Sequence, residues 1–429
     1  MTFELWHLFL LASASLLGLL FMLVLAEPGL PYDIGNPLPS PENHEFMGLI
    51  AALVDAPVAK ATSIEVLTDA VEFYPQELAS IARARRSVHL EAYIFHVSAV
   101  ADRLVDLLTE RARAGVRVRL VIDAIGSWRT PTAYFDGLRA AGGEVAWYQP
   151  VRWHTLKRFN NRTHRELIVI DGDVAFVGGA GIAYWWDTGP PGQPPWRDTM
   201  VRLEGTIVTS VQAAFAENWL ESTGQLLTDP GSFTHCRAVS SATAGGADAI
   251  VVTGTPSAGR ATRARMLFQL LIAGARRSIR ITSPYFLPDR SMQAELQRAV
   301  RRGVRVQVVV PGAFNNHPIA RRASRRRYGN LLGAGVELLE YEPGMNHSKV
   351  LLVDELWVVV GSSNFDNRSF GLNDEINLAL PDRALAARLR EDFERDAALS
   401  RPVDLHSWRT RPMSERLLAL LGALVERQQ

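Results

Sequence analysis

Two histidines of this 429-residue chain lie in stretches of nearly the same design, with surroundings that could support chemistry. His164 stands in "THRELIVID" and His347 in "NHSKVLLVD", and each stretch continues into a second apolar segment that ends in glycine. Two positions after the histidine, one copy has Glu166 and the other has Lys349. A single histidine on a strand is more often structural than catalytic. Two copies at the same place of a repeat favour a catalytic role.

The second copy has the residue types that binding of a phosphodiester requires. His347 and Lys349 are two positions apart on a predicted strand, so their side chains leave the same face. Gly361, Ser362 and Asn364 follow after one further predicted strand. Glycine lets the backbone approach a ligand closely, and serine and asparagine supply neutral donors. Lysine and asparagine can neutralise and orient phosphate oxygens, while a neutral imidazole can attack phosphorus.

An imidazole that acts as a nucleophile must be held in one tautomer, usually by a carboxylate on its other nitrogen. Glu375, in "NDEINL", follows His347 by 28 residues, and Asp198, in "WRDTMV", follows His164 by 34 residues. The similar spacing predicts that each acid binds the histidine of its own half.

A metal centre is the competing interpretation of these residues, and we set it aside. The single cysteine, Cys236, excludes a cysteine-based metal site, and Lys349 would repel a cation. No metal and no cofactor are therefore expected. The chain has 46 Lys plus Arg and 45 Asp plus Glu, and this neutral balance does not favour nucleic acid as a partner.

The elements that must position these residues form an internal repeat. In each half, an amphipathic helix runs into an apolar strand, and a second helix, a glycine (Gly115 or Gly303) and another strand precede the histidine segment. Short β-branched runs that alternate with helices predict an α/β fold with helices on both faces of a sheet. The predicted organisation is a membrane anchor at 1–30, a linker at 31–60, a first half at 61–230, a linker at 231–255, a second half at 256–400 and a tail with an amphipathic helix at 401–429.

The N-terminal segment 5–26 contains no Asp, Glu, Lys or Arg. A helix of that length would cross a hydrocarbon core of ~30 Å. A cleaved signal peptide is the alternative, but the first residues, "MTFE", lack the basic region that a signal peptide has. We therefore expect a retained single-pass anchor in the cell membrane, without a preference for the side on which the rest of the chain lies.

The segment 346–377 resembles the HxK(x)4D(x)6GSxN motif of the phospholipase D superfamily. The match is complete at His347, Lys349, Asp354, Gly361, Ser362 and Asn364. Further stretches, among them "SPYFLPDRSMQAELQRAVRRGVRVQVVVPG" and "WRDTMVRLEG", look like the cardiolipin synthases of bacteria. The resemblance covers nearly everything after residue 60. It implies a duplicated phospholipase D-like α/β/α sandwich, whose two similar halves share one active-site cleft.

The resemblance also implies a reaction by two histidines without a metal. One histidine attacks the phosphodiester and forms a phosphohistidine, and the other protonates the leaving alcohol and then deprotonates the incoming one. In cardiolipin synthases, the phosphatidyl group passes from one phosphatidylglycerol to another and glycerol is released; with water as acceptor, the same site is a phospholipase. Asp171 and Asp354 match the aspartates of the catalytic motif, and we expect them to be structural supports rather than phosphate contacts.

The first half departs from the motif at two positions, because Glu166 replaces lysine and Gly181 replaces asparagine. Both changes weaken phosphate binding and spare the histidines and their acids. Glu166 either pairs with a nearby base or binds something other than phosphate, such as an acceptor hydroxyl; decay of this half is the third interpretation. The candidate bases are Arg162, Arg165 and Lys349. The predicted substrate-binding residues are Asn364, Ser362, Glu166 and Gly179, and the intact surroundings of His347 favour it as nucleophile.

Three functions remain open from the sequence. The leading one is a membrane-anchored phosphatidyltransferase of the cardiolipin-synthase type, with phospholipid and membrane as partners. The second is a phosphodiesterase that hydrolyses phospholipid or, with less support, nucleic acid. The third is a non-enzymatic lipid-binding relative. The aromatic and proline-rich stretch 183–196 either dips into a membrane interface or packs around a proline-rich turn.

Overall fold

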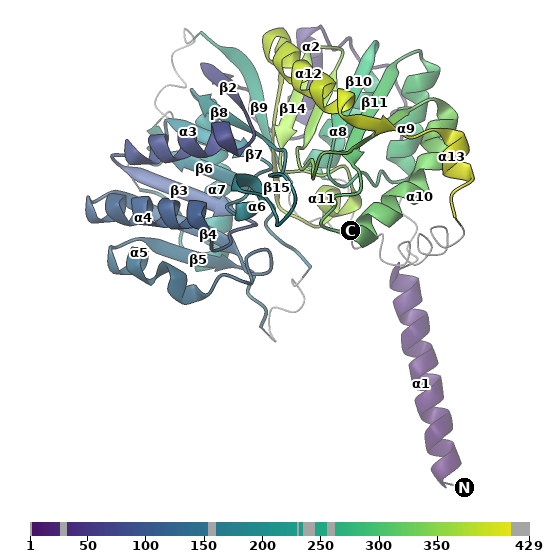
Figure 1. Ribbon diagram of the computed structural model, residues 1–429, viewed down its shortest axis with the longest axis horizontal. Helices are drawn as coiled ribbons and strands as arrows, with labels where there is room; N and C mark the ends of the chain where they lie inside the picture. Colours follow the sequence, from purple (N-terminus) through teal and green to yellow (C-terminus); the bar gives the residue numbers. More distant parts are fainter. Residues whose placement is uncertain are drawn as a thin grey trace.

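The structure is a computed structural model, and it describes residues 2–25, 32–152, 160–229, 231–234, 245–254 and 262–412. Within these residues the chain forms two mixed β-sheets with helices around them (Figure 1). The amphipathic helix predicted near the C-terminus, at 414–429, lies outside the described residues.

The first sheet has seven strands in the described part of the chain, in the order β2-β8-β7-β6-β3-β4-β5. Strands β3, β4 and β5 run parallel, and all other neighbours are antiparallel. The bounds are β2 (Ser63–Thr68), β3 (Ser87–Ala92), β4 (Arg117–Asp123), β5 (Glu144–Tyr148), β6 (Glu166–Ile170), β7 (Val174–Gly178) and β8 (Thr199–Glu204).

The second sheet repeats this order and adds one strand at each edge. Its order in the described residues is β1-β9-β15-β14-β13-β10-β11-β12-β16, so β9 takes the place of β2 and β13 the place of β6. The bounds are β1 (Ala59–Ala61), β9 (Ala247–Gly254), β10 (Ser278–Thr282), β11 (Arg305–Pro311), β12 (Glu337–Tyr341), β13 (Val350–Val353), β14 (Trp357–Gly361), β15 (Glu375–Pro381) and β16 (Ser400–Pro402). The duplicated α/β fold is therefore as predicted.

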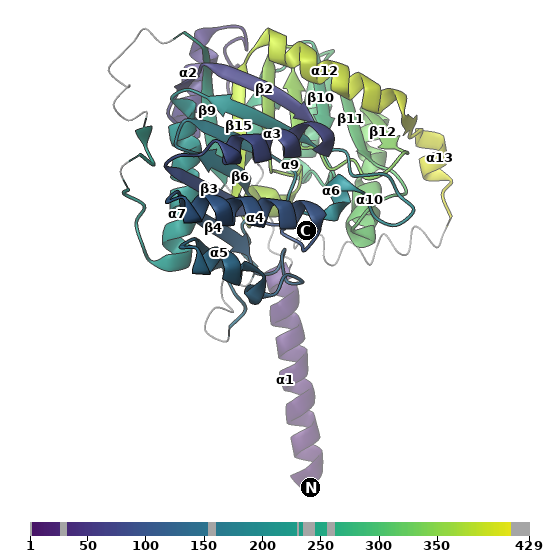
Figure 2. The ribbon, with the colours of Figure 1, turned by 60° about the vertical axis from the view of Figure 1, so that its left-hand side comes forward.

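Helices cover the outer face of each sheet. α3, α4 and α5 pack on the first sheet, and α8, α9 and α10 pack on the second (Figures 1 and 2). Gly115 and Gly303 end α4 and α9 with φ of +87° and +88°, a backbone conformation that glycine adopts without strain. The helix bounds are α2 (His44–Leu53), α3 (Ala70–Ala82), α4 (Ala99–Arg113), α5 (Asp136–Ala140), α6 (Tyr184–Asp187), α7 (Ile207–Thr223), α8 (Arg263–Gly274), α9 (Arg290–Arg301), α10 (Pro318–Ala334), α11 (Asn367–Gly371), α12 (Arg383–Ala398) and α13 (Leu405–Arg409).

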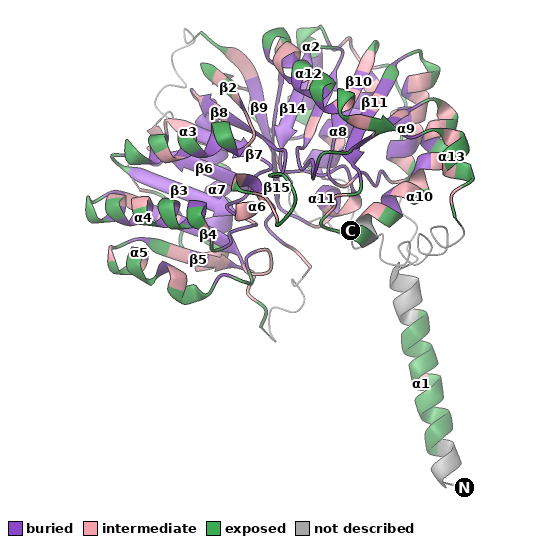
Figure 3. Cartoon of the chain, in the orientation of Figure 1, coloured by how far each residue is buried: buried purple, intermediate pink, exposed green. Residues whose placement is uncertain are grey.

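The inner faces of the two sheets share one core. Successive side chains of a strand point to opposite faces. Leu167 and Val169 of β6 accordingly lie in the shared core, with residues of α7 and α12, whereas Ile168 and Ile170 pack toward the helices of the first half. Figure 3 shows that the central strands of both sheets are buried, whereas the edge strand β2 is partly exposed. The two halves therefore form one unit, and residues between the sheets are held by both.

Secondary structure occurs where linkers were predicted. The segment 31–60 contains α2, which packs on the second half: Phe46 meets the edge of Trp357 with ring centroids 5.5 Å apart, and the Trp357 Nε1–H donates to the Pro41 carbonyl at 2.9 Å. The segment 231–255 contains β9, which lies between β1 and β15 in the second sheet.

The N-terminal helix α1 (Thr2–Leu25) projects away from the two-sheet body (Figures 1 and 2). In the part of the chain that the structure describes, no helix has the length and apolar character needed to cross a membrane. The prediction of a transmembrane helix is therefore wrong, and the structure does not bear out a single-pass anchor.

Candidate active site

The two histidines precede equivalent central strands, one in each sheet. His164 lies just before β6 and His347 just before β13. Both are buried, with exposed fractions of 9% and 3%. The charge of His164 also contributes to lowering the pKa of His347, which requires the two imidazoles to be near each other. The structure therefore brings both predicted histidines to one site.

A short bridge between the halves brings Glu375 to His164. Thr163, the residue before His164, pairs in parallel with Asp374, the residue before Glu375. The backbone N–H of His164 donates to the Asp374 carbonyl at 2.8 Å. Because the two chains run side by side, Glu375 Oε2 lies 3.1 Å from His164 Nδ1. The first histidine is thus bound by the acid of the second half.

An equivalent bridge brings Asp198 to His347. Asn346 pairs in parallel with Arg197, and the backbone N–H of His347 donates to the Arg197 carbonyl at 2.7 Å. Asp198 Oδ2 consequently lies 2.9 Å from His347 Nδ1. The second histidine is bound by the acid of the first half.

The prediction that each acid binds the histidine of its own half is therefore wrong, although the four residues are the predicted ones. The cause is strand order. β7 lies between β6, which follows His164, and β8, which follows Asp198. Neighbouring strands are about 4.8 Å apart, so the two side chains would have to bridge about 10 Å. In the second half, β14 separates Glu375 from His347 in the same way.

Each acid has a second hydrogen-bond donor, and the two donors differ. The Ser362 hydroxyl donates to Glu375 Oε2. The equivalent position in the first half is Gly179, which has no hydroxyl, and the Trp186 indole N–H donates to Asp198 Oδ2 at 3.0 Å instead. Trp186 was not predicted as a site residue. The missing hydroxyl at Gly179 was the signal that another donor was needed.

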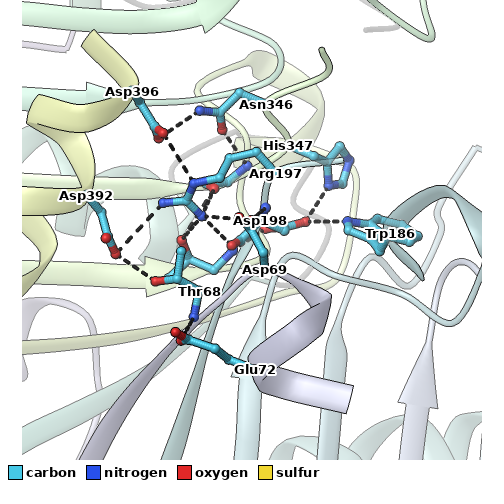
Figure 4. Close-up of polar contacts among 12 residues, drawn as sticks. Thr68, Asp69, Glu72, Trp186, Arg197, Asp198, Asn346, His347, Asp392 and Asp396 are labelled. Atoms are coloured by element: carbon cyan, nitrogen blue, oxygen red, sulfur yellow. Dashed lines mark hydrogen bonds and ion pairs between the residues drawn. The ribbon is translucent and has the colours of Figure 1, made fainter. Parts of the chain in front are cut away.

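Arg197 fixes Asp198 against the second half (Figure 4). Its guanidinium lies 3.3 Å from Asp396 Oδ1 and 3.8 Å from Asp392 Oδ2, both on α12, and Nη1 donates to the Asp198 carbonyl. The Asp198 backbone N–H donates to Asp69 Oδ1 at 3.0 Å. Buried charges of this kind are stable only when they are paired. The backbone of Asp198, and with it the carboxylate that holds His347, is therefore tied to both halves.

Lys349 is buried between the halves, next to His347. Its Nζ donates to the His347 carbonyl at 2.6 Å and lies 2.7 Å from Nδ1 and 3.2 Å from Nε2 of that imidazole. A Cβ on Gly179 would lie 3.0 Å from Nζ, so the glycine leaves room for the lysine. Burial lowers the pKa of Lys349 to about 8, although nearby carboxylates of both halves raise it.

The imidazole of His347 is held in its neutral form. Burial and then the ammonium of Lys349 lower the pKa of His347 to about 4, although the hydrogen bond and charge of Asp198 act in the opposite direction. A neutral imidazole has the free lone pair that attack on phosphorus requires. Because Nδ1 faces Asp198, the nitrogen available for attack is Nε2.

Glu166 is bound by backbone rather than by a base. Its Oε1 accepts hydrogen bonds from the backbone N–H groups of Tyr93 at 3.2 Å and Ile94 at 3.1 Å. Burial raises the pKa of Glu166 well above its ordinary value, while the Ile94 N–H and the charge of Lys349 act in the opposite direction.

The two arginines considered as partners of Glu166 pair with other acids. Arg162 Nε lies 3.1 Å from Asp123 Oδ2, and Arg165 Nη2 lies 2.7 Å from Glu217 Oε2. The arginine pairings are thus excluded, and Lys349 acts on Glu166 through its charge.

Gly181 allows close approach of the Ile94 backbone and of Glu166. A Cβ on Gly181 would lie 2.6 Å from the Ile94 carbonyl oxygen and 2.9 Å from Glu166 Oε1. We predict that Gly181→Ala lowers the free energy of unfolding by about 1–3 kcal/mol, because the surrounding atoms must shift to admit a methyl group. Denaturant unfolding measures this loss.

Gly48→Ala is the matched control for Gly181→Ala. Gly48 lies inside α2, and a Cβ there meets nothing within 4 Å. That variant should be as stable as the parent or about 0.5–1 kcal/mol more stable, since alanine favours a helix. Equal stability of the Gly181→Ala variant and the parent chain would contradict the tight contact.

The two motif aspartates bind backbone amides. Asp171 accepts hydrogen bonds from the N–H groups of residues 85–87, and Asp354 from those of residues 276–278. Each aspartate follows its strand, β6 or β13, at the end opposite to the histidine. In both halves the carboxylate is occupied in holding the turn before β3 or β10.

The remaining motif residues differ in what they contact. A Cβ on Gly361 would lie 2.2 Å from the Ile376 carbonyl oxygen, so the glycine allows close approach of β15 rather than of a ligand. The hydroxyl of Ser362 is used by Glu375. The Oδ1 atom of Asn364 is buried and has no hydrogen-bond partner among the described residues, so Asn364 stays a candidate for substrate binding.

The aromatic part of the stretch 183–196 packs inward. Trp186 and Trp196 are buried, and the centroid of each ring lies 5.4 Å from that of His347. Only the proline-rich residues 191–195 are exposed as a run. These two tryptophans therefore pack against His347, as the packing interpretation predicted.

Comparisons with known proteins give matches over most of the chain. The family model described as cardiolipin synthase, PLD-like domain matches residues 78–186 and 269–397, which contain both histidine segments. A cardiolipin synthase of Geobacillus kaustophilus is 34% identical over 387 residues, covering 90% of this chain and 76% of that protein. Cardiolipin synthase A of Pseudomonas putida is 33% identical over 380 residues, covering 86% of this chain and 76% of that protein.

Solved structures share the fold at lower identity. A phosphatidylserine synthase of Haemophilus influenzae superposes with a TM-score of 0.68 at 15% identity, over 90% of this chain and 100% of that chain. A polyphosphate kinase of Porphyromonas gingivalis gives a TM-score of 0.53 at 12% identity, over 91% of this chain and 57% of that chain. The family model and the sequence relatives show that the chain belongs to the cardiolipin synthase family of phospholipase D-like phosphatidyltransferases.

Proposed function

We propose that this phosphatidyltransferase makes cardiolipin from two molecules of phosphatidylglycerol through a phosphohistidine on His347. The observation that carries the proposal is the pair of crossed histidine–carboxylate contacts around one buried lysine. The crossed contacts supply two imidazoles in fixed tautomers, and the lysine supplies a positive charge for the phosphate.

In the first step, Nε2 of neutral His347 attacks the phosphorus of the donor lipid. The bond from phosphorus to the oxygen of the headgroup glycerol breaks, and protonated His164 gives its proton to that oxygen. Asp198 accepts the Nδ1–H of His347 and stabilises the positive ring that forms, while Glu375 holds His164. Lys349 and Asn364 are the proposed phosphate ligands.

In the second step, the hydroxyl of the acceptor gives its proton to His164 and its oxygen attacks phosphorus. The bond from phosphorus to His347 breaks, so the imidazole returns to its neutral form and His164 is protonated again. The products are cardiolipin and one glycerol. Water in place of the acceptor would give phosphatidic acid from the same intermediate.

Incubation of purified protein with vesicles that contain labelled phosphatidylglycerol tests the proposal. Cardiolipin and glycerol in equal amounts are the expected products. Phosphatidic acid without cardiolipin would identify a hydrolase, and the absence of any product would identify a lipid-binding protein without activity.

Transfer should fall as the pH rises through about 8. The protonated form of Lys349 neutralises the phosphate, and burial lowers its pKa to about 8, so the active form is lost above that pH. The measurement is kcat/KM for cardiolipin formation between pH 6 and pH 10.

Lys349→Arg is the control for this assignment, because arginine stays charged over the whole range. Whatever activity the arginine variant retains should lack the alkaline limb near pH 8. An unchanged limb in this variant would show that another group causes it.

A further inference from the structure

Glu166 and Gly181 are one coupled change rather than two separate losses. A Cβ at 181 would lie 2.6 Å from the Ile94 carbonyl oxygen and 2.9 Å from Glu166 Oε1, so a side chain there would displace both the Ile94 backbone and the carboxyl. The carboxyl thus takes space next to the asparagine position of the motif.

The backbone around Glu166 is also built to hold a carboxyl oxygen. Tyr93 and Ile94 donate their N–H groups to Oε1. The segments "RRSVHLEAYIF" and "RRSIRITSPYF" are equivalent, because each binds its motif aspartate through the same residues. Pro284 therefore stands where Tyr93 stands, and proline has no N–H. The second half, which has Lys349 in place of Glu166, lacks one of these two donors.

The second carboxyl oxygen of Glu166, Oε2, is available to bind a ligand. No hydrogen bond from any described residue reaches Oε2, although Glu166 is only 5% exposed. Glu166 follows His164 by two positions, so both side chains leave the same face of the chain. A group held by Oε2 would lie beside the group that His164 deprotonates.

The charges around Glu166 select the chemistry of that ligand. A phosphate would need a cation, and the cation at this site, Lys349, belongs to the intact motif of the second half. An ammonium group would be repelled by Lys349, whose charge acts on Glu166. An uncharged hydroxyl group meets neither obstacle.

We propose that Glu166 binds a second hydroxyl group of the acceptor, so that the acceptor subsite selects a vicinal diol such as a glycerol headgroup. This inference rests on the proposed function. One hydroxyl of the diol transfers its proton to His164 and attacks phosphorus, and the other stays bound to Glu166 and is unchanged by the reaction.

The test is a competition between propane-1,2-diol and 1-propanol, present at equal concentrations with phosphatidylglycerol vesicles. Both alcohols react with the same phosphatidyl-enzyme, so the ratio of the two products reports the acceptor subsite alone. The parent enzyme should favour the diol about tenfold, the effect of one buried hydrogen bond. Glu166→Met and Glu166→Lys should lower the ratio to about one, and Glu166→Gln, which keeps both hydrogen-bonding groups, should retain most of it.

Glu77→Gln is the matched control, since Glu77 is a buried acid on α3 that has no part in the proposed reaction; its product ratio should equal that of the parent. If the Glu166→Met variant is inactive, the product ratio of the Glu166→Lys variant decides, because lysine is the residue that the motif has at this position. Unchanged ratios in the Met and Lys variants would overturn the inference while the proposed function stands. A parent enzyme that transfers to no alcohol and makes no cardiolipin would overturn the proposed function itself.

Discussion

Replacement of His347 by alanine should reduce cardiolipin formation by at least about 10⁴-fold, because removal of a covalent nucleophile leaves no route to the phosphohistidine. His164→Ala should reduce it by about 10²–10⁴-fold, the usual contribution of a general acid. The measurement is the initial rate with phosphatidylglycerol at saturating lipid.

A donor with an acidic leaving group separates the two roles. A p-nitrophenyl ester of phosphatidic acid releases p-nitrophenolate without a proton from the enzyme. The His164→Ala variant should therefore still give a burst of p-nitrophenolate, whereas the His347→Ala variant should give none. A burst from the His347→Ala variant and none from the His164→Ala variant would reverse the assignment of nucleophile and acid.

Asp198→Asn should slow cardiolipin formation by about 10²–10⁴-fold, since an amide cannot hold the His347 imidazole in the reactive tautomer or stabilise its positive charge. Glu375→Gln should have a comparable effect through His164. With the p-nitrophenyl donor, only Asp198→Asn should suppress the burst, because Asp198 is the acid that contacts the nucleophile.

This comparison tests the crossed pairing directly. If each acid served the histidine of its own half, Glu375→Gln would suppress the burst and Asp198→Asn would spare it. Both variants are isosteric, so the fold is expected to tolerate them. Thermal unfolding of the two variants, which should match that of the parent within a few degrees, is the control.

The repeat in the sequence was sufficient to predict the duplicated fold and the four residues that pair at its centre. Apolar runs and the equivalent glycines 115 and 303 depend on local chain geometry, which sequence patterns report well. The partners of the histidines depend instead on the contact between halves. The bridges of Thr163 with Asp374 and of Asn346 with Arg197 join residues about 150–210 positions apart, and spacing within one half contains no information about them.

The surroundings of Glu166 could not be predicted for the same reason. The sequence suggested side-chain bases as partners of Glu166, but the partners are backbone N–H groups of Tyr93 and Ile94, which any residue type except proline can provide. Trp186 could be expected only as part of the aromatic stretch 183–196, because its donor role depends on the fold that brings it to Asp198.

The most direct test of the central claim is to locate the covalent intermediate. The enzyme is mixed with the p-nitrophenyl donor, denatured within the burst at alkaline pH, digested, and its peptides are analysed by mass spectrometry. We expect a phosphatidyl group on the peptide that contains His347 and an unmodified peptide around His164. A phosphatidyl group on His164, or cardiolipin formation without any modified histidine, would contradict this expectation.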